Sequence, residues 1–116
     1  MIFHLAEAAQ WELARSAGVY TWSTLGRTLA DEGFIHCSEA NQWAATRARF
    51  YTAYPDELVL LSIDEDMLTA PLVREIGNPV TGELFPHLYG SLNLDAVVAT
   101  QILSPPHAAT SEPSSA

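Results

Sequence analysis

The chain has 116 residues, of which 48% are hydrophobic and 16% charged, which is enough apolar material for one hydrophobic core. Its formal net charge is −9, because 14 acidic residues stand against five arginines and no lysine. This balance argues against nucleic acid and anionic membrane surfaces, since both are bound through clustered cations. No apolar run approaches the roughly 20 residues that cross a bilayer. We therefore expect a cytoplasmic domain that acts on or binds a small molecule.

The first third of the chain predicts short strands and one helix. A strand is expected at about 2–5, followed by a helix at 6–16 that ends near Gly18. Strand-like residues follow at 20–22. The mostly apolar run at 34–37 then predicts a short buried strand.

A second helix is expected from Glu39 to Tyr54. Ser38 stands in the right place for its N-cap, and Pro55 helps to end it. The run from Glu57 to Ile63 predicts the strongest strand, and its continuous apolar stretch favours a central position in a sheet.

The remaining sequence predicts further strands and a tail. Residues 72–76 and 97–103 are expected to form strands, whereas the apolar segment 84–90 contains a proline and indicates an edge strand or a shaped loop. Residues 105–116 predict a disordered C-terminal tail, which leaves a single domain at 1–104. Because strands do not alternate strictly with long helices, the fold class is α+β with two main helices.

Three histidines lie in or beside predicted strands and are candidates for a polar site. His4 faces away from its apolar neighbours, and His36 shares a strand face with Ser38. His87 and Tyr89 lie in an aromatic segment shaped by proline and glycine. Two interpretations stay open for His36 and for His87: a ligand-binding role, or a purely structural hydrogen-bonded position.

Other chemistry is less well supported by the sequence. The histidine spacings match none of the usual zinc motifs, so no metal is expected. Cys37 points away from His36 and is assigned to the core rather than to a nucleophile. Glu75 is the preferred candidate for a catalytic carboxylate and Glu83 the second, because both flank the loop that leads to His87.

Three motifs together resemble a known family. They are Ile-Phe-His-Leu at 2–5, Asp-Glu-Gly-Phe-Ile-His-Cys-Ser at 31–38 and Glu-Leu-Phe-Pro-His-Leu-Tyr-Gly at 83–90. The resemblance covers about residues 1–103 and is to a family of small bacterial and plant proteins of unknown function. That family is similar in fold to ADP-ribosyltransferases, which implies two small, mostly antiparallel sheets around a cleft for NAD or another nucleotide.

The resemblance also implies roles for individual residues. In transferases of this fold a histidine or arginine on the first strand holds the ribose, which is the position of His4. His36 and Ser38 stand where a tyrosine or serine is usual, and Tyr20 or Tyr89 would provide an aromatic wall. Cleavage of the nicotinamide–ribose bond passes through an oxocarbenium-like state and needs a carboxylate. Glu75 would supply that carboxylate, although it falls in no identifying motif.

Two functions therefore stay open from the sequence. The first is an ADP-ribosyltransferase-like enzyme that transfers or processes ADP-ribose on a small molecule, with NAD as its substrate. The second is a non-catalytic module that binds a nucleotide or another small ligand in the same cleft. The sequence does not decide the oligomeric state.

Overall fold

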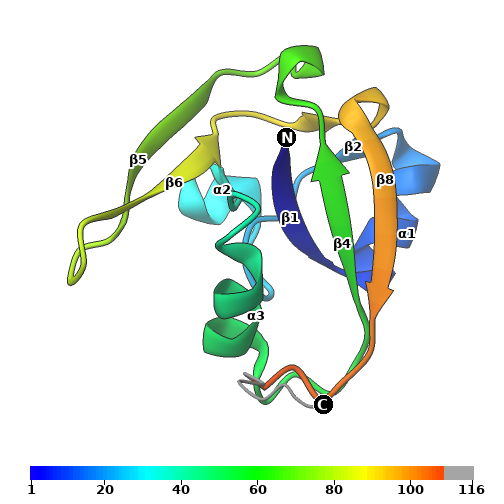
Figure 1. Cartoon of the computed structure of the whole chain (residues 1–116). Coiled ribbons are helices and arrows are strands. Elements are labelled where there is room, and N and C mark those ends of the chain that lie inside the picture. The colour runs from blue at the N-terminus through cyan, green and yellow to red at the C-terminus, as the bar shows by residue number, and fades with distance from the viewer. Residues whose placement is uncertain (109–116) are drawn as a thin grey trace.

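The computed structural model describes residues 1–108 and shows eight strands, three α-helices and two 3₁₀ turns. Figure 1 shows how these elements are arranged. In chain order they are β1 (Ile2–Glu7), α1 (Ala8–Ala17), β2 (Val19–Tyr20), α2 (Leu29–Glu32), β3 (Ile35–His36), α3 (Trp43–Tyr51), β4 (Leu58–Ile63), η1 (Glu65–Met67), β5 (Leu72–Asn78), β6 (Glu83–Leu88), β7 (Leu92–Asn93), η2 (Leu94–Ala96) and β8 (Val97–Leu103).

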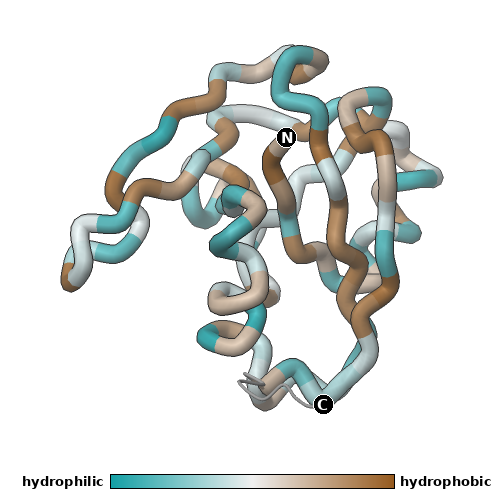
Figure 2. The backbone as a smooth tube through the Cα atoms, viewed as in Figure 1, coloured by the Kyte–Doolittle hydropathy of each residue, from teal (hydrophilic) through white to brown (hydrophobic). Residues whose placement is uncertain are grey.

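The largest core surrounds an antiparallel sheet with the strand order β1-β4-β8. The central position predicted for the run that forms β4 is confirmed. Side chains alternate between the two faces of the sheet along each strand. Both faces of this sheet are buried, each in its own hydrophobic cluster. One face carries Leu61 and packs with Trp11 of α1, and the other carries Leu60 and packs with Tyr51 of α3. The hydrophobic stretch of β4 between the two helices is visible in Figure 2.

A second antiparallel sheet has the order β3-β6-β5, and β2 pairs with β7. The β5–β6 hairpin projects from the body of the molecule (Figure 1). The expectation that segment 84–90 forms an edge strand or a loop is wrong, because β6 is the central strand of this sheet. Proline has no backbone N–H to donate, but Pro86 still contributes to the sheet as an acceptor. Its carbonyl oxygen accepts a hydrogen bond from the Cys37 backbone N–H at 2.9 Å.

The α+β fold class with small antiparallel sheets is confirmed, whereas some helix boundaries differ from expectation. Helix α3 begins at Trp43 rather than at Glu39, and its N-cap residue is Gln42, not Ser38. The side chain of Gln42 instead accepts a hydrogen bond from the Glu39 backbone N–H at 2.9 Å, which stabilises a turn ahead of the helix. Helix α2 is a short helical turn, which is one of the two alternatives that the sequence allows for the segment that ends at Glu32. It begins with a capping box in which Thr28 and Asp31 exchange hydrogen bonds.

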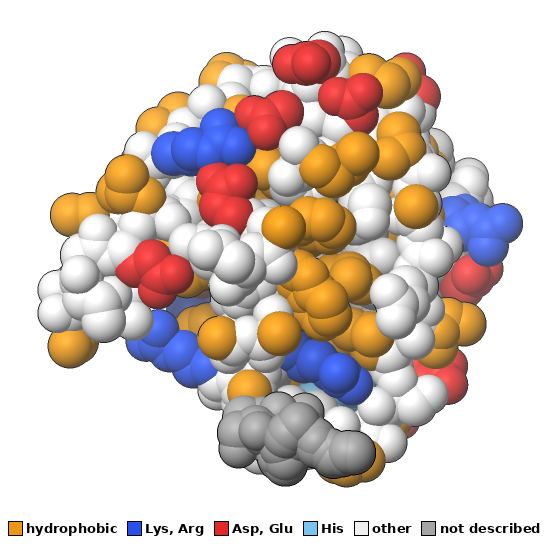
Figure 3. All heavy atoms as spheres, in the orientation of Figure 1, with side chains coloured by type: hydrophobic (Ala, Val, Ile, Leu, Met, Phe, Trp, Pro, Cys, Tyr) orange, Lys and Arg blue, Asp and Glu red, His pale blue; other side chains and the backbone are white. Residues whose placement is uncertain are grey.

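Apolar side chains fill the middle of the face shown in Figure 3, between α3 and β8. Cys37 is buried in the core, as predicted from its strand face. Among residues 1–108, no helix is both long and apolar enough to cross a membrane.

The packed part of the chain continues past the expected boundary at residue 104. His107 is fully buried, and its Nδ1 accepts a hydrogen bond from the Arg47 side chain at 2.9 Å. Its other ring nitrogen therefore carries the proton and donates it to the Asp56 carbonyl oxygen at 2.8 Å. Arg47 also donates to the Ser104 carbonyl oxygen. The rest of the expected tail, residues 109–116, lies outside the described residues.

We expect a chain that ends at Ser104 to be less stable than one that ends at Ala108. The shorter chain loses both hydrogen bonds of His107 and leaves Arg47 without that partner, a loss of about 1–3 kcal/mol in the free energy of unfolding. Urea denaturation of the two truncated chains measures the difference. Equal midpoints and slopes would show that the His107 contacts contribute nothing to stability.

Candidate functional site

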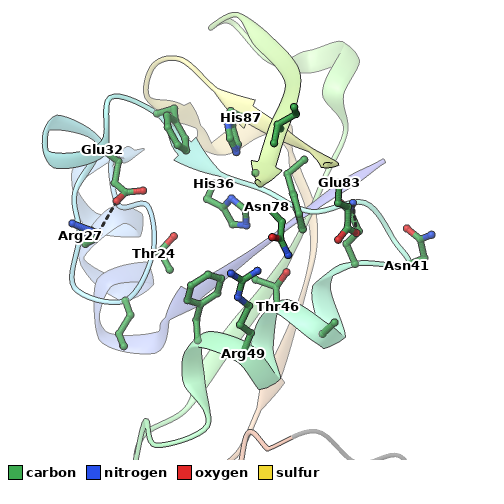
Figure 4. Close-up of a pocket in the computed structure, with 18 residues that line it drawn as sticks. Thr24, Arg27, Glu32, His36, Asn41, Thr46, Arg49, Asn78, Glu83 and His87 are labelled. Atoms are coloured by element: carbon green, nitrogen blue, oxygen red, sulfur yellow. Dashed lines mark hydrogen bonds and ion pairs between the residues drawn. The ribbon is translucent and has the colours of Figure 1, made fainter. Parts of the chain in front are cut away.

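The main cleft of the described structure has a volume of about 570 Å³ and lies between α3, the β5–β6 hairpin and the loop before β3 (Figure 4). This volume is within the range of about 300–1,000 Å³ that is usual for small-molecule sites. Three segments that are distant in sequence form its walls. The helix wall consists of residues at i, i+3, i+4, i+7 and i+8, which share one helix face: Gln42, Ala45, Thr46, Arg49 and Phe50.

One face of the β3-β6-β5 sheet provides the opposite wall. His36 pairs directly with His87 across β3 and β6, and Glu75 pairs with Phe85 across β5 and β6. Directly paired residues on neighbouring strands point to the same side of a sheet. All four side chains therefore lie on one face. The centroids of the two histidine rings are 5.5 Å apart.

His87 is held firmly between a carboxylate and an aromatic ring. Its Nδ1 lies 2.7 Å from a Glu75 carboxylate oxygen, which also accepts a hydrogen bond from the Tyr89 hydroxyl. The ring of Phe34 stacks on His87 with 4.0 Å between centroids and 13° between planes. These contacts fix both the tilt and the rotation of the imidazole.

Both cleft histidines have a ring nitrogen without a partner. Nε2 of His36 and Nε2 of His87 are buried and form no hydrogen bond with any described residue. A buried unpaired polar atom costs about 1–3 kcal/mol, and such atoms are rare in native structures. They are commonest where a ligand, an ion or a water completes the bonding. These two nitrogens therefore mark the cleft as a candidate binding site.

His36 lies in an apolar and aromatic environment that keeps it neutral. Its ring lies 5.0 Å from that of Phe85 and 6.4 Å from that of Phe50. The pKa of His36 is lowered to about 4, mainly by burial and to a smaller extent by the nearby His87, His4 and Arg49. At neutral pH His36 is thus an uncharged imidazole.

The charges around the cleft are mostly paired with each other. Arg27 and Glu32 form an ion pair at 3.1 Å, and the Glu83 carboxylate accepts a hydrogen bond from Gln42 at 3.0 Å. Arg49 differs, because within residues 1–108 no carboxylate forms an ion pair with it. Its guanidinium lies 5.1 Å from the centroid of the Phe50 ring.

His4 lies in the core behind the cleft rather than in it. Its Nδ1 is 2.6 Å from the His36 carbonyl oxygen, and its Nε2 is 2.8 Å from the Tyr20 hydroxyl. Since a carbonyl can only accept, Nδ1 carries the proton and Nε2 accepts from Tyr20. Burial lowers the pKa of His4 to about 4, despite the bond to the His36 carbonyl. His4 therefore connects the two sheets and has no free nitrogen for a ribose.

The structure thus separates the residues that the sequence analysis grouped together. His36 and His87 line the cleft, while Glu75 and Tyr89 form hydrogen bonds behind His87. Ser38 is buried beside a void of about 10 Å³ that also touches His4 and His36. Tyr20 is buried in the core, so neither expected tyrosine forms an aromatic wall of the cleft.

The aromatic wall and the cleft arginine were not predicted from the sequence. The wall is formed by Phe34, Phe50 and Phe85. Phe50 lines the cleft from α3, and the residue is 42% exposed. The spacing of Gln42, Thr46 and Arg49 along one helix face could have indicated the polar wall. Among the described residues, no group of three or more His, Cys, Asp or Glu side chains could hold a metal ion.

Stability should fall as the pH is lowered from about 6.5 to about 4. In this window His4 and His36 stay neutral in the folded state but bind protons in the unfolded state, because their folded pKa values lie near 4 instead of 6.5. Each can remove up to about 3 kcal/mol across the window. Urea denaturation at several pH values measures the slope, which His36→Gln should reduce.

Asp31→Asn is the matched control for this slope. Hydrogen bonds from the Thr28 backbone and side chain lower the pKa of the Asp31 carboxyl below 3.8, so it titrates below the window. The substitution changes stability but should leave the slope between pH 4 and 6.5 intact. A slope that His36→Gln does not change would contradict the neutral assignment of His36.

Comparison with solved structures finds a similar fold in protein CC0527 from Caulobacter crescentus. Its crystal structure is 28% identical to this chain, has a TM-score of 0.75 and covers 89% of this chain and 85% of that one. The solution NMR structure of the same protein is 29% identical, with a TM-score of 0.64 and coverage of 89% and 84%. Neither structure is described as an ADP-ribosyltransferase, so these matches do not support that part of the expected fold.

The comparison with curated proteins gives no match. A family model described as "Protein of unknown function (DUF952)" matches residues 5–100, which include both cleft histidines and the whole of α3. This match confirms that the chain is a small domain of a family of unknown function. The chain belongs to the DUF952 family.

Proposed function

We propose that this protein binds a small anionic molecule with a flat unsaturated ring, of the nucleotide class, in the cleft between α3 and the β5–β6 hairpin. The observation that carries the proposal is the arginine without a carboxylate partner beside an aromatic wall. Arg49 and the rings of Phe34, Phe50 and Phe85 line one cavity. Aromatic side chains stack on bases, with a contribution of about 1–3 kcal/mol per base.

The charge of the chain favours a small ligand over a polymer. A single arginine can pair with one phosphate or carboxylate, while the net charge of −9 repels a longer polyanion. Arginine recognises such groups through charge-assisted hydrogen bonds. NAD, ADP-ribose and AMP each combine a flat ring with phosphate, so they are suitable probes for this ligand class.

Binding should appear as a rise in melting temperature that grows with ligand concentration. We expect AMP or ADP-ribose to raise it in the wild-type chain and Arg49→Met to weaken that binding about tenfold or more, because one charge-assisted hydrogen bond is lost. Arg27→Met is the matched control. It removes a second arginine that lines the cleft but is already paired with Glu32. If Arg27→Met and Arg49→Met have the same effect, the anion site is not at Arg49.

Transfer of ADP-ribose from NAD is the second candidate function, and Glu75 is the observation that favours it. Hydrogen bonds from Tyr89 and His87 lower the pKa of the Glu75 carboxyl, so it is ionised at neutral pH. However, both bonds turn this carboxylate toward His87 and Tyr89 rather than toward the cleft. Glu32 and Glu83 are similarly engaged with Arg27 and Gln42. We therefore infer that binding is better supported than transfer.

Incubation with NAD distinguishes the two functions. We expect NAD to remain intact, because no carboxylate of the described cleft is free to stabilise an oxocarbenium-like ribose. Chromatographic detection of nicotinamide measures this directly. Release of nicotinamide by the wild-type chain that disappears in Glu75→Gln would contradict a purely binding role and favour the transferase.

A further inference from the structure

The cleft has two chemically different ends that are connected by a chain of contacts. His87 lies beside His36, His36 lies beside Phe50, and the Arg49 guanidinium lies 5.1 Å from the centroid of the Phe50 ring. Figure 4 shows the same order, with His87 and Arg49 on opposite sides of His36. A ligand that spans the cleft therefore meets an imidazole at one end and a guanidinium at the other.

In its neutral form, the imidazole at this end can only accept a hydrogen bond. The Glu75 carboxylate is an acceptor, so Nδ1 of His87 must carry the proton that lies between them at 2.7 Å. In the neutral ring Nε2 is then an unprotonated lone pair. His87 is 4% exposed, and this Nε2 has no partner among the described residues. A buried acceptor of this kind requires an N–H or O–H group from a ligand.

Two features disfavour a ligand anion at this end. The Glu75 carboxylate bonded to His87 is itself negative and repels a second carboxylate or phosphate, an effect that solvent reduces because the Glu75 side chain is 35% exposed. The neighbouring His36 is neutral and offers no compensating charge. An anion is favoured at the opposite end, where Arg49 has no carboxylate partner within the described residues.

We propose that the cleft selects a ligand by two groups at once: a neutral N–H or O–H donor that bonds to Nε2 of His87, and an anion held by Arg49. The inference rests on the proposed function and adds to it the orientation of the ligand, with its donor group at His87 and its anion at Arg49. Glu75 acts as a positioning residue, since it sets the tautomer of His87 without touching the ligand. The site thereby rejects molecules that have the anion and the ring but lack the donor.

The test compares AMP with purine riboside 5′-monophosphate, which is the same molecule without the 6-amino donor. Isothermal titration calorimetry of the full chain should show binding at least tenfold weaker for the analogue, because the buried acceptor is then left unpaired. In His87→Phe, whose ring can still stack on Phe34, the two nucleotides should bind equally. Glu83→Gln is the matched control, since Glu83 lines the same hairpin wall but bonds to Gln42, and it should keep the preference.

Equal affinities of the wild-type chain for the two nucleotides would overturn the proposal, as would a preference that survives in His87→Phe. A second measurement separates this inference from the nucleotide class itself. Nitrogen-15 NMR of the histidine side chains in the ligand-free protein should show His87 protonated at Nδ1 and unprotonated at Nε2. If neither nucleotide binds, the nucleotide class fails. The Nδ1–H form then still supports the acceptor end, and an Nε2–H form overturns it.

Discussion

The pairing of β3 with β6 is the contact on which the candidate site depends. It consists of two residue pairs, Ile35 with Leu88 and His36 with His87. The first pair is buried in the main core, and the second faces the cleft. A shift of β3 by one residue in this register would turn His36 into the core and expose Ile35. The buried pair therefore fixes the geometry of the functional pair.

So short a pairing needs support from outside the sheet, and β1 provides it. The Phe3 and Ser38 backbones exchange hydrogen bonds of 2.7 and 2.8 Å, and His4 donates to the His36 carbonyl. Three polar contacts thus join the two sheets directly behind the cleft. This explains why a histidine on the first strand is fully bonded and buried: its role is to hold His36 in place. The arrangement is stable only with a neutral imidazole, which burial ensures.

Strand periodicity predicted a large part of this site. The alternation of side chains along one short motif was enough to separate His36 from Cys37. His87 was selected by the aromatic, proline and glycine residues around it, and Glu75 by its place beside the loop that leads to His87. Periodicity could not show that the segment with Pro86 is the central strand of its sheet. The sequence does not indicate which neighbouring strands donate hydrogen bonds to the carbonyl oxygens of this segment. Nor could it identify Arg49, since a helix in a small domain has two buried faces, and the pattern does not say which one meets a cleft. His107 was assigned to a tail because its partners, Arg47 and Asp56, are about 50 residues or more away in sequence.

Contacts between its own walls hold the cleft in shape, which bears on how it can be selective. Gln42 bonds to the Glu83 carboxylate and to the Leu84 carbonyl oxygen, and so fixes the projecting hairpin to the start of α3. Within the hairpin, Gly77 of β5 lets the Phe85 ring of β6 lie against its backbone, since a Cβ at this position would come within 2.6 Å of that ring.

A preformed cleft spends little binding energy on ordering its own walls. Most of the energy of a well-placed hydrogen bond can then appear as a difference in affinity between similar ligands. Two buried ring nitrogens without a partner are consistent with such a site, because a ligand that bonds to them recovers the cost of leaving them unpaired.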